Sequence, residues 1–206
     1  LHNIQILMML AIMVVGIQSC SDDLHDVGDV EVNFTAMLPT DTRTRSFGKA
    51  EQVNTLVVGV FNTQKEELER KEFAINGTSV NITLALAQNQ TYSFIFWAYD
   101  SNRNIYDIDD LTAIEMNTLP NPITFSEAEA SDAFFATEED IIITGSSSYS
   151  IELVRPLAQI NVGTTGKVMQ ASFTAKSAPD TFHPFTNTVS GTVDFTWNFS
   201  NTTTET

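Results

Sequence analysis

Apolar and polar residues alternate with a period of two along much of this chain, a pattern typical of strands with one buried face. In the first such segment, residues 30–38, one face carries Val30, Val32, Phe34, Ala36 and Leu38. The same alternation recurs in residues 80–86 and, most clearly, in residues 189–199. Shorter apolar and β-branched runs predict further strands at 53–61, 141–143, 149–153 and 158–162.

Residues 92–99 differ because both faces of the predicted strand are apolar. One face carries Tyr92, Phe94, Phe96 and Ala98, and the other carries Ile95, Trp97 and Tyr99. Such a strand is expected to be covered on both sides, so its rings should pack in a core rather than form a sugar-binding platform. Asn89-Gln90 separates it from the preceding strand and predicts a hairpin.

Helix signals are few. Ser126 and Glu129 have capping-box spacing before residues 130–135, and Asp109-Asp110 precedes a candidate short helix at 111–116. Many short strands with little helix predict an all-β fold, a β-sandwich with Greek-key connections. A boundary near the serine run at 146–148 divides the chain into an N-terminal β-sandwich domain, 30–150, and an incomplete second domain, 151–206.

The first 19 residues carry no Asp, Glu, Lys or Arg and end at the only cysteine, Cys20. The apolar stretch has the length of a signal-peptide core and is short for a spanning helix. Residues 17–20 (Ile-Gln-Ser-Cys) resemble the bacterial lipobox. That resemblance implies that residues 1–19 are a lipoprotein signal peptide, that Cys20 becomes the acylated N-terminus, and that residues 20–29 form an acidic linker. A plain secretory signal or an N-terminal membrane helix are the alternatives, and the start at Leu1 without a basic region suggests that a few residues are missing.

The charge balance narrows the range of partners. The chain has 26 acidic and 10 basic residues, for a net charge of -16. Such a polyanion is repelled by phosphate backbones and anionic headgroups, so nucleic acid is not an expected partner. A single cysteine allows no internal disulfide, unlike many small secreted eukaryotic domains.

No catalytic, metal or cofactor site is predicted. The histidines, His2, His25 and His183, have no metal-ligand spacing. Asp100-Ser-Asn102-Arg-Asn104 opens like a calcium loop, but Ile105 and Leu111 stand where the loop needs Gly and Glu, so an ordinary acidic turn is expected. Tyr106 and Phe125 are the aromatic residues expected to be exposed, and they are too scattered to define a binding face.

Three segments together resemble the fimbrillin-like surface lipoproteins of Bacteroidales. They are Ser19-Cys-Ser-Asp-Asp23, Ser131-Asp-Ala-Phe-Phe135 and Val154-Arg-Pro-Leu-Ala-Gln-Ile-Asn-Val-Gly-Thr164. The resemblance implies two tandem transthyretin-like sandwiches, the second one truncated here. It also implies that Ser21, Asp22 and Asp23 act as a signal for export to the cell surface.

The resemblance further implies a mode of assembly. An arginine-specific protease would cut the loop after the first strand at Arg43 or Arg45 and release the strand that carries Val30, Val32, Phe34, Ala36 and Leu38. A strand from another fimbrial subunit would then fill the groove by strand addition. Other implied partners are the outer-membrane lipid, through acylated Cys20, and a host or bacterial surface ligand.

Three functions remain open at this stage. The favoured one is a structural or adhesive pilus subunit, or an accessory anchor or tip protein, located in the outer membrane at the cell surface or in the fimbrium. A surface glycan-binding lipoprotein of an outer-membrane uptake system is the alternative, and it would need an exposed aromatic platform. A hydrolase with a carboxylate pair is the third, although many acidic residues make such pairs common by chance.

Overall fold

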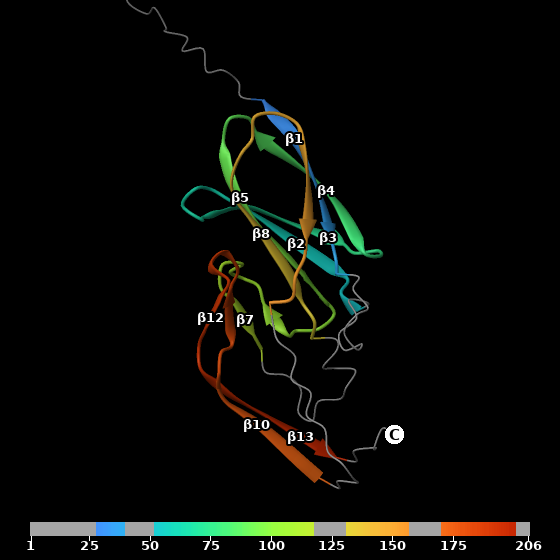
Figure 1. Ribbon diagram of the computed structural model, residues 1–206, viewed down its shortest axis with the longest axis vertical. Coiled ribbons are helices and arrows are strands. Elements are labelled where there is room, and N and C mark those ends of the chain that lie inside the picture. Colours follow the sequence, from blue (N-terminus) through green and yellow to red (C-terminus); the bar gives the residue numbers. More distant parts are fainter. Residues whose placement is uncertain (1–27, 40–51, 118–130, 157–169, 201–206) are drawn as a thin grey trace, which may run out of the picture.

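The computed structural model describes residues 28–39, 52–117, 131–156 and 170–200. Strands dominate these residues, and none of them forms an α-helix; η2 (Pro184–Thr186) is a short 3₁₀ turn. The predicted all-β class is therefore confirmed. The strands form several sheets, most of them antiparallel, which Figure 1 shows along the length of the molecule.

Two sheets pack face to face as a β-sandwich. One has the order β4-β1-β9, and the other has the order β3-β2-β5-β8. The first sheet consists of β1 (Asp29–Met37), β4 (Ser79–Ala87) and β9 (Ser147–Glu152). The second consists of β2 (Thr55–Phe61), β3 (Glu67–Ala74), β5 (Thr91–Tyr99) and β8 (Phe134–Ile142). Alternate residues of β1 and β4 meet alternate residues of β2 and β5 in a core that excludes water.

A second apolar core lies on the other face of the four-stranded sheet. It is closed by a small sheet of order β12-β11-β7-β6, made of β6 (Tyr106–Asp107), β7 (Ile114–Met116), β11 (Thr181–His183) and β12 (Thr188–Ser190). Phe182 and Ile114 pack there with Trp97. Strand β5 therefore has Phe94 and Phe96 in one core and Ile95 and Trp97 in the other, which confirms the prediction of a strand covered on both faces.

The short helices were predicted wrongly. Ile114–Met116 is strand β7, which pairs with β6 and β11. The Asp110 carboxylate accepts hydrogen bonds from the backbone N–H and hydroxyl of Thr112, so the capping signal belongs to a turn. Phe134 and Phe135 begin strand β8; the residues of the other capping box, 126–129, lie outside the described residues.

The hairpin predicted at Asn89-Gln90 is also wrong, because β4 and β5 belong to different sheets. Asn89 has a left-handed backbone (φ 62°). The Asn89 N–H donates to Ile143 O (2.6 Å), and the Ile143 N–H donates to Gln90 O (2.9 Å). The turn is thus fixed to the end of β8 and carries the chain from one layer of the sandwich to the other.

The long strand predicted at 189–199 is divided at Gly191. Gly191 has φ +81°, and a Cβ there would lie 1.7 Å from Asp180 Oδ1. The chain therefore ends β12 and begins β13 (Val193–Ser200), which pairs with β10 (Gln170–Ala178) in a two-stranded ribbon. Figure 1 shows this ribbon below the sandwich.

The packing runs through the boundary predicted at residue 150. Strand β9 pairs with β1 in the first sheet, and Ile151 and Leu153 are buried in the first core. The first sandwich thus extends at least to Leu153. Phe182, placed by the sequence in the second domain, lies in the second core beside Trp97. The division into two domains stays a prediction.

Candidate functional site

Strand β1 is the middle strand of its sheet. It pairs antiparallel with β4, from Asp29↔Ala87 to Met37↔Ser79. It pairs parallel with β9, from Val32↔Ser147 to Met37↔Glu152. The two neighbours are held together through β1, so its removal would leave a groove with unpaired backbone groups on both sides.

The inward face of β1 is almost completely buried. The exposed fraction is 0% for Val32, 1% for Phe34 and Ala36, and 5% for Leu38, while Val30 at the start of the strand is partly buried. Burying a side chain the size of Val, Leu or Phe contributes about 1.5–3 kcal/mol. Filling the groove that removal of β1 would leave is therefore strongly favourable.

Phe34 is the largest side chain that β1 contributes. Its ring centroid lies 4.9 Å from that of Phe94, 5.4 Å from that of Phe96 and 5.2 Å from that of Tyr149, with the Tyr149 ring stacked at 22°. Aromatic pairs at such distances contribute about 0.5–1.5 kcal/mol beyond their buried area. The Phe34 ring thus joins the two sheets at the centre of the sandwich.

The outward face of β1 is polar. The Thr35 hydroxyl donates to Asn81 Oδ1 (3.1 Å), and the Thr83 hydroxyl donates to Asn33 Oδ1 (2.7 Å). Both pairs are exposed, so they contribute less than the buried side chains to holding β1 in place.

The residues directly before β2 are fixed by contacts of their own. Val53 is buried in the first core, and the Asn54 N–H donates to Tyr99 O (3.1 Å). The Asn54 side chain donates to Asp100 Oδ1 (2.8 Å) and accepts from Ser101 N–H (3.0 Å). Strand β2 is therefore held by contacts that do not involve β1.

Several predicted site residues lie outside the described residues. They are the acylation site Cys20, the export signal Ser21, Asp22 and Asp23, and the cleavage sites Arg43 and Arg45. Their roles stay predictions. The residues of the predicted removable strand, Val30, Val32, Phe34, Ala36 and Leu38, are described, and they form the inward face of β1 and its continuation.

Two of the motifs that carry the family resemblance meet in space. Phe135 and Val154 exchange backbone hydrogen bonds of 2.8 and 2.9 Å. Arg155 Nη2 lies 2.9 Å from Asp132 Oδ2, and the guanidinium lies 5.2 Å from the centroid of the Phe134 ring. The motifs thus join the end of β9 to the start of β8. Sequence reasoning missed this contact because about twenty residues separate its partners and nothing local signals it.

The aromatic residues in the middle of β5 form no exposed platform. Trp97 and Phe96 are buried in the two cores, as predicted. The expectation that Tyr106 is exposed is wrong: it is 7% exposed, its hydroxyl donates to Ser131 O, and burial raises its pKa. Phe125 lies outside the described residues.

The acidic turn at residue 100 has the structure of a turn. Asp100 Oδ1 accepts from the Asn102 N–H (3.1 Å), and Arg103 Nε lies 3.4 Å from Asp100 Oδ2. Among the described residues, no three His, Cys, Asp or Glu side chains converge as metal ligands. Within those same residues, no helix is long and apolar enough to cross a membrane.

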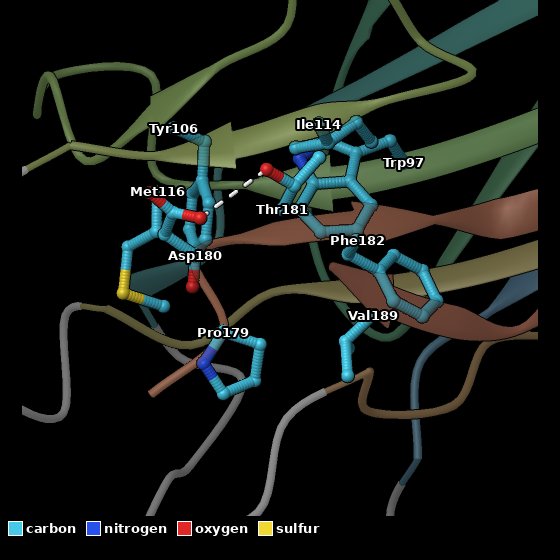
Figure 2. A pocket seen from close by; sticks show the side chains of 9 residues that line it. All are labelled: Trp97, Tyr106, Ile114, Met116, Pro179, Asp180, Thr181, Phe182 and Val189. Atoms are coloured by element: carbon cyan, nitrogen blue, oxygen red, sulfur yellow. Dashed lines mark hydrogen bonds between the residues drawn. The ribbon is translucent and has the colours of Figure 1, made fainter. Parts of the chain in front are cut away.

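One small cavity lies between β7, β11 and β5, lined by apolar side chains that include Trp97, Met116 and Phe182 (Figure 2). Its volume is about 40 Å³. Small-molecule sites have volumes of several hundred Å³, whereas a few tens of Å³ accommodate water. The cavity is thus too small to hold a sugar ring. Trp97 lines the cavity, and its Nε1–H has no hydrogen-bond partner among the described residues.

Comparisons with known proteins agree with an all-β fold. A family model described as a family of unknown function (DUF6562) matches residues 24–206. No curated protein matches the chain significantly.

Solved structures with a similar fold come from Bacteroides. A candidate adhesin of Bacteroides thetaiotaomicron is 12% identical with a TM-score of 0.53, over 86% of this chain and 73% of that one. A candidate adhesin of Bacteroides ovatus is 11% identical with a TM-score of 0.52, over 86% and 71%. A candidate polysaccharide-binding protein of B. thetaiotaomicron is 11% identical with a TM-score of 0.49, over 81% of this chain. The chain spans 64% of that protein's length. At these identities the likeness to the two candidate adhesins shows the fold alone.

Proposed function

The chain belongs to the DUF6562 family of unknown function, and we propose that it is a cell-surface lipoprotein of the fimbrillin type that assembles by β-strand addition. In this proposal the protein is a structural or adhesive pilus subunit, or an accessory anchor or tip protein. It acts by binding other subunits and a surface, and not by catalysis.

The observation that carries the proposal is the position of β1. Among the described residues it is the first strand, it is the middle strand of its sheet, and it contributes a full row of buried side chains to the core. One backbone cut between β1 and β2 would separate β1 from every later strand that the structure describes. Because Asn54, directly before β2, is hydrogen-bonded to Tyr99 and Asp100, β2 keeps these contacts when β1 leaves, whereas β4 and β9 lose their common neighbour.

The remaining features of the proposal come from the sequence. Acylated Cys20 would hold the protein in the outer membrane, since two or more acyl chains anchor stably where one is marginal. Ser21, Asp22 and Asp23 would direct it to the cell surface. Cleavage after Arg43 or Arg45 would release both the lipid and β1 and would convert the protein into a polymerising subunit. The fold shared with two candidate adhesins of Bacteroides supports an adhesive role.

The experiment is to recover the full-length protein from its native cell surface and determine its intact mass and N-terminal sequence. A start at Thr44 or Ser46 without lipid is expected for a stalk subunit. An acylated Cys20 is expected for an anchor or accessory protein that keeps β1. An unacylated N-terminus ahead of β1, with no cut in the loop, would contradict the proposal in both forms.

A further inference from the structure

We propose that Phe34 and Ala36 act as a register key for the groove that β1 fills. A strand that occupies this groove must run in the direction of β1 and carry an aromatic residue followed, two positions later, by a small one. The inference rests on the proposed exchange of β1 and specifies the chemistry of the partner strand.

The first half of the key is the space filled by Phe34. Three rings surround it, Phe94 and Phe96 from β5 and Tyr149 from β9, with centroids within 5.4 Å. Phe34 itself is 1% exposed, so its ring occupies a closed space. An aliphatic or small residue in that position would leave a cavity lined by aromatic faces, and such a cavity in a core is strongly destabilising.

The second half of the key is the lack of space at Ala36. Ala36 is 1% exposed, and its partners across the sheet are Val80 on β4 and Ile151 on β9. Val80 is 8% exposed and Ile151 is 2% exposed. A large ring at this position would have to displace buried branched side chains from both neighbouring strands, and overpacked cores are destabilised.

The key matters because alternation alone does not fix the register. A slip by one residue exchanges the polar and apolar faces and is excluded. A slip by two keeps the apolar face inward, and Val30, Val32 and Leu38 could replace one another with modest loss. The pair formed by Phe34 and Ala36 penalises that slip in either direction. In one direction the ring meets the crowded position and Val32 enters the aromatic space; in the other, Leu38 meets the crowded position and Ala36 leaves the aromatic space largely unfilled.

The same pair fixes the direction of the strand. In the observed direction β1 is antiparallel to β4 and parallel to β9, and the Leu153 N–H donates to Met37 O (2.9 Å) at the end of the parallel pair. A strand inserted in the opposite direction would present the small residue before the aromatic one. Its pairing with β4 would become parallel and its pairing with β9 antiparallel, so the two ladders would exchange their hydrogen-bond patterns.

The test uses the full chain cut after Arg43 or Arg45 and freed of its β1 segment. Synthetic peptides of residues 28–39 are titrated into this protein, and Kd is measured by calorimetry. The variant peptides carry Phe34→Ala alone, or Phe34→Ala with Ala36→Phe, a swap that preserves composition and overall hydrophobicity. A peptide with Thr35→Val, on the exposed face, is the matched control. All changes lie in the peptide, so the folding of the protein is the same in every titration.

We expect the Phe34→Ala and swap peptides to bind about 100-fold more weakly than the native peptide, or worse, because a core phenylalanine is lost or misplaced. The Thr35→Val peptide should bind within about fivefold of the native one. Equal affinity of the native and swap peptides would overturn the key while leaving strand exchange intact. If the native peptide does not bind at all, strand exchange itself fails, and the key fails with it.

Discussion

At the scale of single residues, the tight packing of the second core against β2 is clearest at Gly59. A Cβ at this position would lie 2.7 Å from Leu111 Cδ1 and 2.7 Å from Phe61 Cε2. We predict that Gly59→Ala lowers the free energy of unfolding by about 1–3 kcal/mol, because buried side chains must move to admit the methyl group. Urea denaturation of the full chain measures this change.

Gly145 is the matched control for Gly59. A Cβ there would meet no heavy atom within 4 Å, and the residue is not in the left-handed region. Gly145→Ala should therefore leave the free energy of unfolding unchanged or raise it by less than about 1 kcal/mol, through reduced entropy of the unfolded chain. Equal effects of the two substitutions would show that the packing around Gly59 is looser than the 2.7 Å approaches indicate.

The buried hydroxyl of Tyr106 predicts a pH dependence. Burial, together with the nearby Asp132 charge, raises the pKa of Tyr106 above its ordinary value of about 10. Between pH 10 and the higher pKa in the folded state, the unfolded chain releases this proton and the folded chain keeps it. The free energy of unfolding should therefore fall as pH rises above 10, and fall less in Tyr106→Phe.

Denaturation at pH 8 and at pH 10.5–11 compares the two proteins. Tyr106→Phe should lose about 1 kcal/mol at pH 8, where the hydrogen bond to Ser131 O is missing, and should then show the flatter pH profile. Parallel profiles for the two proteins would contradict the buried position of the hydroxyl.

The residue scale also shows where sequence reasoning stops. The burial of Phe94, Phe96 and Trp97 follows from two apolar faces on one strand. The burial of Tyr106 does not, because its cover comes from β11 and from Ser131, both remote in sequence. The ion pair of Arg155 with Asp132 is likewise set by the path of the chain and not by any local pattern.

At the scale of elements, the β11–β12 hairpin is part of the second core. Phe182 on β11 is 5% exposed, and its ring meets Phe135 edge to face at 4.7 Å and Trp97 at 6.2 Å. Phe185 in η2 packs edge to face on Phe61 (5.1 Å), with Lys65 Nζ 4.4 Å from its centroid. The hairpin thus covers the face of the β3-β2-β5-β8 sheet that points away from β1.

We predict that Phe182→Ala lowers the free energy of unfolding by about 3–5 kcal/mol, as expected for a buried phenylalanine. Val189→Ala, on the paired strand of the same hairpin but 53% exposed, should cost less than about 1 kcal/mol. Thermal and urea unfolding of both variants test this. A small effect of Phe182→Ala would mean that the hairpin is not packed against Trp97 and Phe135.

The alternation of apolar and polar residues predicted the strands that have one solvent-exposed face, such as β1 and β4. It missed β3, whose sequence is mostly charged, because that strand is an edge strand held by pairing with β2. It favoured a helix where β7 forms, because the capping residue Asp110 stabilises a turn equally well. It joined β12 to β13 because a glycine turn at Gly191 does not interrupt the apolar period.

At the scale of the whole molecule, the all-β class and the sandwich were predictable from the number of strands and their period. The order of strands within each sheet was not, because period two gives the face of a residue and not its neighbour. The position of β1 between β4 and β9 depends on pairing between residues more than 40 positions apart. This position is what makes β1 a candidate for exchange.

Because the molecule has two separate cores, we expect it to stay folded when β1 is removed. The first core loses a row of side chains, whereas the second core, around Trp97 and Phe182, makes no use of them. Strand β5 would still be paired with β2 and β8. The open groove is therefore expected to persist in a folded subunit.

Hydrogen exchange read by mass spectrometry, on the full chain cut in the loop after β1 and freed of that strand, tests this claim most directly. We predict that amides of β4 and β9 lose protection, while those of β2, β5 and β8 keep it. Adding the β1 peptide back should restore the protection. Loss of protection in all of these strands together would show that the groove does not exist without β1, and would contradict assembly by strand addition.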